Sequence, residues 1–296
     1  MLGTVICESH ADRAPIPNGS TPVTVTGTEA ELCRAPERDR LKAVAHRSDQ
    51  TIRQIVPPAA YDEQVGIPLS VLLAIPLIAA GPGHAVHRTA EIGRSVDGRA
   101  IHVVESGTPG QPRVLVVGCI HGNECAGMAV IRALRRRPPP AHADLWLVPT
   151  LNPDGRAGAT RQNAHGVDLN RNFAAGWSRH GAPGSTYYSG PRPFSEPETQ
   201  AARRLITAIR PKVTVWYHQH MRLVWTSGRS VPAGRRYATV VGLPLYVHRS
   251  PGGAASEWIR TRFPRLRAFA VELPAGRLSR GGVRRHVGAV LAMARP

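Results

Sequence analysis

The hydrophobic and polar residues of this 296-residue chain follow three different patterns in succession. Residues 1–64 show no sustained helical or strand period and are rich in Pro, Thr and Gly, which is typical of disordered segments. Residues 65–85 contain one continuous apolar run. From residue 86 onward, short apolar runs alternate with amphipathic stretches. We therefore expect one folded domain over residues 86–296, preceded by two segments of different character.

The apolar run at residues 67–80 has the length of the hydrophobic region of a signal peptide and is too short to span a bilayer. Gly83-His84-Ala85 behind it has the small-x-small pattern of a signal-peptidase site. No basic segment directly precedes the run. We expect an exported protein whose residues 1–64 are disordered or a mis-assigned upstream extension. The alternative is a buried apolar segment of a genuine N-terminal domain.

The part from residue 86 onward has the pattern of an α/β domain. Apolar runs predict strands at residues 100–105, 114–118, 145–149, 213–218 and 267–273. Helical periods predict helices at residues 124–137, 195–210 and 282–294. The second of these helices opens with the capping-box pattern of Ser195 and Glu198. Alternating strands and helices predict a single domain with a mixed, mostly parallel central sheet and helices on both faces.

The net charge is +18, and it is concentrated in the predicted domain. Residues 86–296 contain 31 Lys and Arg against 11 Asp and Glu. Such an excess favours anionic partners, but only two of the chain's 38 basic residues are lysines, so an arginine-rich codon bias explains it equally well. Aromatic residues make up only 5%, with no interleaved aromatic and basic platform, so we expect no nucleic-acid partner. Four cysteines exclude a disulfide-framework protein.

Polar residues follow the ends of several predicted strands, where the catalytic groups of open α/β sheets gather. His121 and Glu124 stand three residues apart at the start of a helix, so their side chains can reach one point. His218 and His220 follow another strand and share one face if that strand continues. We favour His218, the first polar residue after the apolar run. Glu272 is a carboxylate at the end of the last strand.

Two histidines and one glutamate would leave a fourth position open on zinc, as a catalytic site requires. Zinc lowers the pKa of water toward neutrality, so a nucleophile would exist at physiological pH. Glu272 is then the free carboxylate that can act as general base. Arg161 and Arg171, on the long loop that follows the third predicted strand, are available to stabilise an oxyanion.

Other polar residues near these positions have structural explanations. Cys119 and Cys125 flank the metal-binding pattern, and we expect a buried thiol pair or, in an exported protein, a disulfide. Asp154 and Gly155 are expected to form a turn. None of the four is expected to bind metal.

Five elements in order resemble the zinc carboxypeptidases of the carboxypeptidase A type. They are HGNE, NPDG, the RxN…GVDLNRNF block, a third histidine after an apolar strand, and a late glutamate in VELPAG. The resemblance covers residues 92–286, and the text YYSG with PFSEPET is similar to the bacterial branch that includes murein tripeptide amidases. Two histidines and one glutamate are the known zinc ligands of carboxypeptidase A itself.

The resemblance implies a role for each matched residue. It assigns one Zn²⁺ ion per chain to three ligands, His121, Glu124 and His218. Arg161 would polarise the scissile carbonyl, and Glu272 would deprotonate the attacking water and return the proton to the leaving amine. Asn170 and Arg171 would bind the terminal carboxylate of the substrate. Family members also place a mobile tyrosine over the substrate. Tyr246 is one match for it, but the sequence around Tyr246 is too divergent for the role to be carried over.

These observations predict an exported zinc metallocarboxypeptidase that hydrolyses an amide bond near the C-terminus of a small peptide. The resemblance points to a peptidoglycan stem peptide as substrate. The alternative enzyme is a zinc deacylase of the succinylglutamate desuccinylase or aspartoacylase type, acting on N-acyl amino acids. A basic polymer-binding protein on an inactive peptidase scaffold is the non-enzymatic alternative. We expect no membrane span, and the oligomeric state stays open.

Overall fold

The structure is a computed structural model that describes residues 84–295. The expectations for residues 1–64, and for all but the last two residues of segment 65–85, lie outside the described residues. The described strands are β1 (Val86–Arg94), β2 (Ala100–Gly107), β3 (Arg113–Val117), β4 (Asp144–Val148), β5 (Val213–Gln219), β6 (Leu223–Thr226), β7 (Leu245–Val247) and β8 (Arg267–Leu273). The described helices are α3 (Gly127–Arg135), α4 (Pro153–Gly158), α5 (Pro197–Ile209), α6 (Val231–Val241), α7 (Ala255–Arg262) and α8 (Arg280–Met293), with 3-10 turns η2 (Leu169–Arg171) and η3 (Gly228–Ser230).

All eight described strands form one mixed sheet in the order β1-β2-β4-β3-β5-β8-β6-β7. Its centre is parallel, because β4, β3, β5 and β8 run side by side in the same direction. The strand β1 at one edge pairs antiparallel with β2, and β6 pairs antiparallel with β8. The carboxyl ends of the four central strands therefore meet at one edge of the sheet, which is where the loops with the candidate residues begin.

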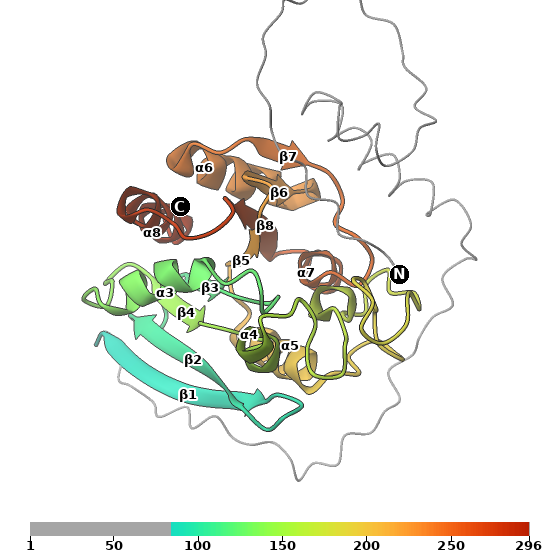
Figure 1. Cartoon of the computed structure of the whole chain (residues 1–296). Coiled ribbons are helices and arrows are strands. Elements are labelled where there is room, and N and C mark those ends of the chain that lie inside the picture. The colour runs from blue at the N-terminus through green and yellow to red at the C-terminus, as the bar shows by residue number, and fades with distance from the viewer. Residues whose placement is uncertain (1–83, 296) are drawn as a thin grey trace, which may run out of the picture. The chain divides into compact units, whose positions relative to one another are not determined.

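Helices cover both faces of the sheet, as Figure 1 shows. On one face, α3, α6 and α8 bury an apolar layer that includes Val130, Tyr237 and Val290. On the other face, α5 and α7 bury a second layer with Leu205, Ile259 and the sheet residue Trp216. Alternate residues of each central strand pack into one layer or the other, as expected for strands buried on both sides. The predicted fold class, a mixed sheet between helices, is confirmed.

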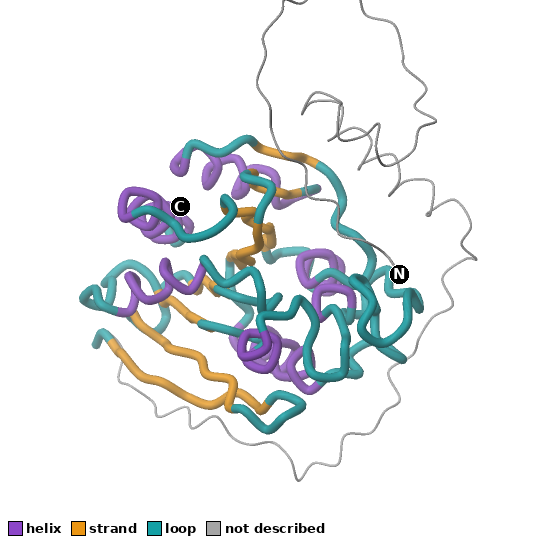
Figure 2. Tube along the Cα trace, in the orientation of Figure 1, coloured by secondary structure: helices purple, strands orange, loops and turns teal. Residues whose placement is uncertain are grey.

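Most predicted elements are present, with shifted ends. The strand at residues 267–273 has the predicted bounds, and the other four predicted strands differ by one or two residues. The helix predicted from residue 124 begins at Gly127, because a disulfide and the candidate metal ligands occupy the residues before it. Figure 2 shows the segment between α4 and α5 mainly as loop, also as predicted. No helix among residues 84–295 is long and apolar enough to cross a membrane.

The capping box predicted for α5 is wrong. This helix begins at Pro197, and its N-cap residue Glu196 makes no side-chain cap. The Ser195 hydroxyl instead donates to Glu196 Oε1 at 2.6 Å, and the two carboxylates of Glu196 and Glu198 both accept from Asn163 Nδ2. The Ser195 hydroxyl is thus engaged by its neighbour Glu196 and the Glu198 carboxylate by a residue of the preceding loop, so the two do not form the local cap.

Candidate metal centre and substrate site

The loop after β3 carries two of the candidate ligands. A disulfide joins Cys119, two residues after the strand, to Cys125, so it encloses both His121 and Glu124. The backbone N–H of Ala126, at the start of α3, donates to Gln219 Oε1 of β5 at 3.0 Å. The loop is thus fixed at both ends, which answers the question left open for the two cysteines.

The other two candidates lie on adjacent central strands. His218 in β5 is paired directly with Glu272 in β8 in the parallel register. Paired residues of neighbouring strands point to the same face of a sheet, so both side chains rise on the same side of the carboxyl edge. His220, the alternative ligand, is exposed and lies outside the cluster.

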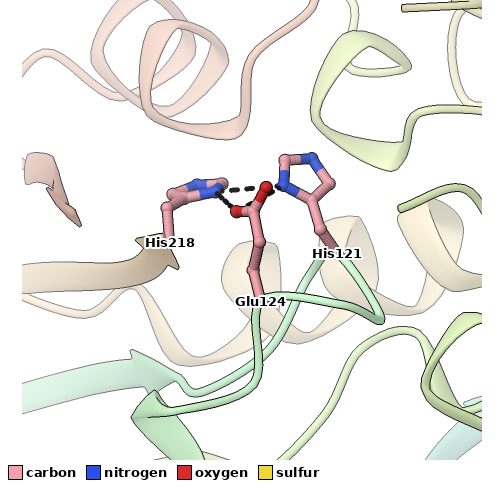
Figure 3. Close-up of side chains that lie close together, drawn as sticks. All are labelled: His121, Glu124 and His218. Carbon is pink, nitrogen blue, oxygen red and sulfur yellow. Dashed lines mark hydrogen bonds and ion pairs between the residues drawn. The ribbon is translucent and has the colours of Figure 1, made fainter. Parts of the chain in front are cut away.

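Three side chains converge at this edge: His121, Glu124 and His218 (Figure 3). The Nδ1 atoms of the two histidines are 3.2 Å apart, and Glu124 Oε2 lies 2.9 Å from His121 Nδ1 and 3.2 Å from His218 Nδ1. A tetrahedral ion with bonds of roughly 2.05 Å separates its ligand atoms by roughly 3.3 Å. The donor types and their spacing therefore fit zinc, with three protein ligands and room for a fourth.

Asp168 orients His121, a role that the sequence analysis missed. Its carboxylate is fully buried, and Oδ1 lies 2.9 Å from His121 Nε2. With Nε2 engaged in this way, Nδ1 is left to face the metal position, as in other carboxylate–histidine pairs at zinc sites. The only sequence signal was the position of Asp168 within GVDLNRNF, which carries no period or charge pattern.

Arg161 links this carboxylate to the glutamate ligand. Its guanidinium donates to Glu124 Oε1 at 2.7 Å and to Asp168 Oδ2 at 2.9 and 3.1 Å. Burial raises the pKa of Asp168, but the neighbouring His121 and arginine charges outweigh it and hold that pKa well below its usual range. Glu124 likewise keeps a depressed pKa despite burial, because the two histidines hydrogen-bond to it. Both carboxylates are therefore ionised at neutral pH.

The residues expected to bind the substrate carboxylate lie next to the metal cluster. Asn170 Oδ1 accepts from the Ala255 N–H at 3.0 Å, and its Nδ2 lies 3.4 Å from His218 Nε2. Burial, reinforced by the nearby positive charge of Arg161, lowers the pKa of Arg171. Arg161 is already paired with Glu124 and Asp168, whereas Arg171 forms no ion pair among residues 84–295. Arg171 is therefore the guanidinium that can attract a carboxylate.

An aromatic side chain covers both arginines. The ring of Tyr187 lies 5.5 Å from Arg161 Cζ and 5.1 Å from Arg171 Cζ, within cation–π range. Tyr187 is itself 46% exposed, so it stands between the arginine pair and solvent. In the sequence, Tyr187 stands out only as part of the YYSG motif and not as a residue of the site.

Two glycines allow the motif loops to pack backbone against backbone. A Cβ on Gly122 would lie 1.9 Å from the carbonyl carbon of Gly155, so the HGNE and NPDG loops are in direct main-chain contact. Gly253 has φ +74°, and a Cβ there would lie 2.0 Å from the Arg171 carbonyl oxygen. These close approaches require glycine. The turn predicted at Asp154 and Gly155 is wrong, because both residues lie in the helix α4. Asp154 has a different structural role, since it accepts hydrogen bonds from Ser95 and Arg99.

Tyr246 lies on the edge strand β7, away from the cluster. It packs against Trp225 with ring centroids 4.9 Å apart and against His248 at 5.7 Å. Tyr246 is paired with Trp225 of β6, and Trp225 is paired with Ala270 of β8. Since Ala270 and Glu272 are two residues apart in one strand, Tyr246 lies on the same sheet face as Glu272. The structure does not bring Tyr246 into contact with the metal ligands.

The zinc carboxypeptidase family matches residues 84–238, slightly more than half of the chain. Murein peptide amidase A of Escherichia coli K12 is 31% identical over 186 residues, which is 57% of this chain and 75% of that protein. Human carboxypeptidase Z is 37% identical over 119 residues, or 30% of this chain and 18% of that protein. The chain therefore belongs to the zinc carboxypeptidase family.

Solved structures agree with this assignment. Murein-tripeptide amidase from Escherichia coli O157 superposes with a TM-score of 0.56 at 26% identity, covering 74% of this chain and 94% of that one. Carboxypeptidase A from Helicoverpa armigera superposes with a TM-score of 0.62 at 19% identity, covering 71% of this chain and 68% of that one, and shows the shared fold. The protein is a hydrolase of the metallocarboxypeptidase type with zinc as its cofactor.

Proposed function

We propose that this enzyme hydrolyses an amide bond near the C-terminus of a small peptide, with Glu272 as general base. The observation that carries the proposal is the state of Glu272. Its Oε2 atom is buried and hydrogen-bonds to no group among residues 84–295, although its strand partner is the ligand His218. A buried carboxylate oxygen without a partner is costly and is found where chemistry needs it.

His121, Glu124 and His218 would hold the zinc ion, which when bound polarises the scissile carbonyl and acidifies water. Glu272 then accepts a proton from the attacking water at its free Oε2 and delivers that proton to the leaving amine nitrogen as the amide bond breaks. Arg161, already aligned beside Glu124 and Asp168, would stabilise the negative charge on the former carbonyl oxygen.

Asn170 and Arg171 would bind the terminal carboxylate of the substrate. The Asn170 amide is fixed by the Ala255 N–H and points its Nδ2 toward His218, so a carboxylate held there lies beside the metal position. The positive charge of Arg171 favours a substrate with a free carboxylate at this end. An N-acyl amino acid, the substrate of the alternative deacylase, also has such a group.

Peptidoglycan stem peptide is the substrate class we favour. Its support is the 31% identity to murein peptide amidase A and the 94% coverage of the related tripeptide amidase structure. The test incubates the zinc-loaded full chain with a pool of ordinary peptides, muropeptides and N-acyl amino acids, and follows the products by mass spectrometry. Glu272→Gln is the variant expected to be inactive. Glu91→Gln makes the same substitution at an exposed glutamate and is the matched control.

We expect cleavage of a muropeptide amide by the native chain and by Glu91→Gln, and none by Glu272→Gln. Cleavage of N-acyl amino acids alone would replace the peptidase with the deacylase. Full activity of Glu272→Gln would refute the assignment of the base.

We also propose that the protein is exported. The support is the apolar run at residues 67–80 and the disulfide between Cys119 and Cys125, since disulfides persist mainly in oxidising compartments. N-terminal sequencing of the native protein should give a start near Val86. A mature protein recovered from the cytoplasm with both cysteines reduced would contradict the proposal.

A further inference from the structure

One helical layer of the protein carries positive charge without any negative charge. The helices α3, α6 and α8 contain no Asp or Glu. Nine exposed arginines lie on these helices or within two residues after α3, and one of them is Arg236. The other eight are Arg132, Arg135, Arg136, Arg137, Arg235, Arg280, Arg284 and Arg285. We call these eight residues the cationic layer.

The three helices form a broad surface. All three pack on the same face of the sheet through their apolar sides, with α8 in contact with both α3 and α6 (Figure 1). Their arginine-bearing sides therefore face away from the sheet. With 14 residues, α8 is about 21 Å long, and neighbouring helix axes lie about 10 Å apart. The layer is thus about 20 Å across in both directions.

The acidic residues of the described chain neutralise other arginines. Glu105 pairs with Arg88, Asp144 with Arg113, and Glu257 with both Arg249 and Arg260. The remaining ion pairs lie in the metal site, on the loop before α5, or among residues 91–99 and Asp154. Within residues 84–295, no arginine of the cationic layer forms an ion pair. Its charge is available to a partner.

We propose that the cationic layer docks the enzyme on a bilayer of anionic phospholipids. The layer is wide and made of helices packed side by side, which matches a flat array of phosphate groups. Guanidinium groups bind phosphate oxygens in a bidentate manner, and basic clusters of this size on helix surfaces recognise acidic headgroups. The metal ligands are not part of the layer, because they lie at the carboxyl edge of the strands. The proposal does not depend on the substrate.

The test measures sedimentation of the full chain with vesicles of pure phosphatidylcholine and of phosphatidylcholine with about 30 mol% phosphatidylglycerol, an anionic fraction that gives a negative surface potential. The layer variant is Arg280→Gln/Arg284→Gln/Arg285→Gln. The matched control is Arg156→Gln/Arg179→Gln/Arg265→Gln, which removes the same charge from exposed arginines outside the layer. Near-UV circular dichroism and zinc content verify the fold of both variants.

Each arginine near an anionic bilayer contributes about a fivefold increase in partitioning, so the layer variant should bind about 100-fold more weakly to the anionic vesicles. The control should bind within about threefold of the native chain, and about 1 M salt should release all three, since the screening length falls to about 3 Å. Equal weakening in both variants would show a general charge effect and overturn the proposal. Binding to duplex DNA that blocks or replaces vesicle binding would assign the layer to nucleic acid and overturn it as well.

Discussion

Replacing Asp168 by Asn tests whether the second carboxylate of the site, and not only the three ligands, determines zinc affinity. The side chain is fully buried and contacts His121 Nε2 at 2.9 Å, Arg161 at 2.9 and 3.1 Å, and the Asn170 N–H at 2.9 Å. An asparagine can still accept from His121 and from the Asn170 N–H. Its Nδ2 group must then face the Arg161 guanidinium, donor against donor and without a compensating charge.

The substitution Asp168→Asn should lower both the zinc affinity and the free energy of unfolding. Loss of a carboxylate that orients a histidine ligand lowers metal affinity by about 10- to 100-fold. Leaving the buried Arg161 with Glu124 as its remaining counter-ion costs about 3 kcal/mol of the free energy of unfolding, at the low end for a broken buried pair. Zinc affinity would be measured by chelator competition, and stability by urea unfolding of the metal-free full chain.

Asp154→Asn is the matched control. Asp154 is also buried and paired with an arginine, but its partners are Ser95, the Asp97 N–H and Arg99, remote from the ligands. We expect this variant to lose stability and to keep native zinc affinity. If Asp168→Asn binds zinc as tightly as the native chain, the orienting role of Asp168 is refuted, whatever happens to stability.

Three further changes have defined outcomes. Burial raises the pKa of Glu198 to about 7, above the unfolded value of 4.5. The protonated Glu198 side chain therefore contributes fully to the free energy of unfolding below pH 4.5, and this contribution is lost as the pH rises through 7. Glu198→Gln should therefore gain about 3 kcal/mol relative to the native chain between pH 4.5 and 8 in urea titrations, and a pH-independent difference would refute this. Replacing Cys119 and Cys125 by Ser should lower the free energy of unfolding by about 2 kcal/mol and weaken zinc binding, as measured by chelator competition. Unchanged zinc affinity would show that the disulfide does not preorganise the loop. Tyr187→Ala should raise KM about threefold because its cation–π contacts are lost, whereas Tyr187→Phe should keep the native KM. Equal KM values for the two variants would contradict the role of the ring.

Strands with continuous apolar runs were predictable, and the polar or short elements were not. The segment at residues 267–273 was predicted with the bounds of β8 because the apolar residues 268–271 lie between Arg267 and Glu272, and Pro274 follows Leu273. The edge strand β1 alternates exposed residues with half-buried ones and has no apolar run, so it was missed. The helix α6 contains Pro232 and Gly234, and α7 has only eight residues, so neither has a clear helical period.

The candidate site, like the fold, could be predicted from the sequence only in part. Residue types and local spacing were enough to select His121, Glu124, His218 and Glu272, because each lies at or just after the end of an apolar strand and carries metal or acid–base chemistry. The choice between His218 and His220 depended on where β5 ends, and only the folded strand placed one of them in the cluster.

The fold class, the order of the motifs and the set of chemical groups could be predicted from the sequence, because they depend on periodicity and on neighbours a few residues apart. The tertiary structure alone decided how distant residues combine. It placed Asp168 behind His121, Tyr187 over Arg161 and Arg171, and beside His218 a Glu272 oxygen that has no hydrogen-bond partner within residues 84–295. Strand register and loop packing set these contacts. They join residues tens of positions apart, and no local pattern encodes such distances.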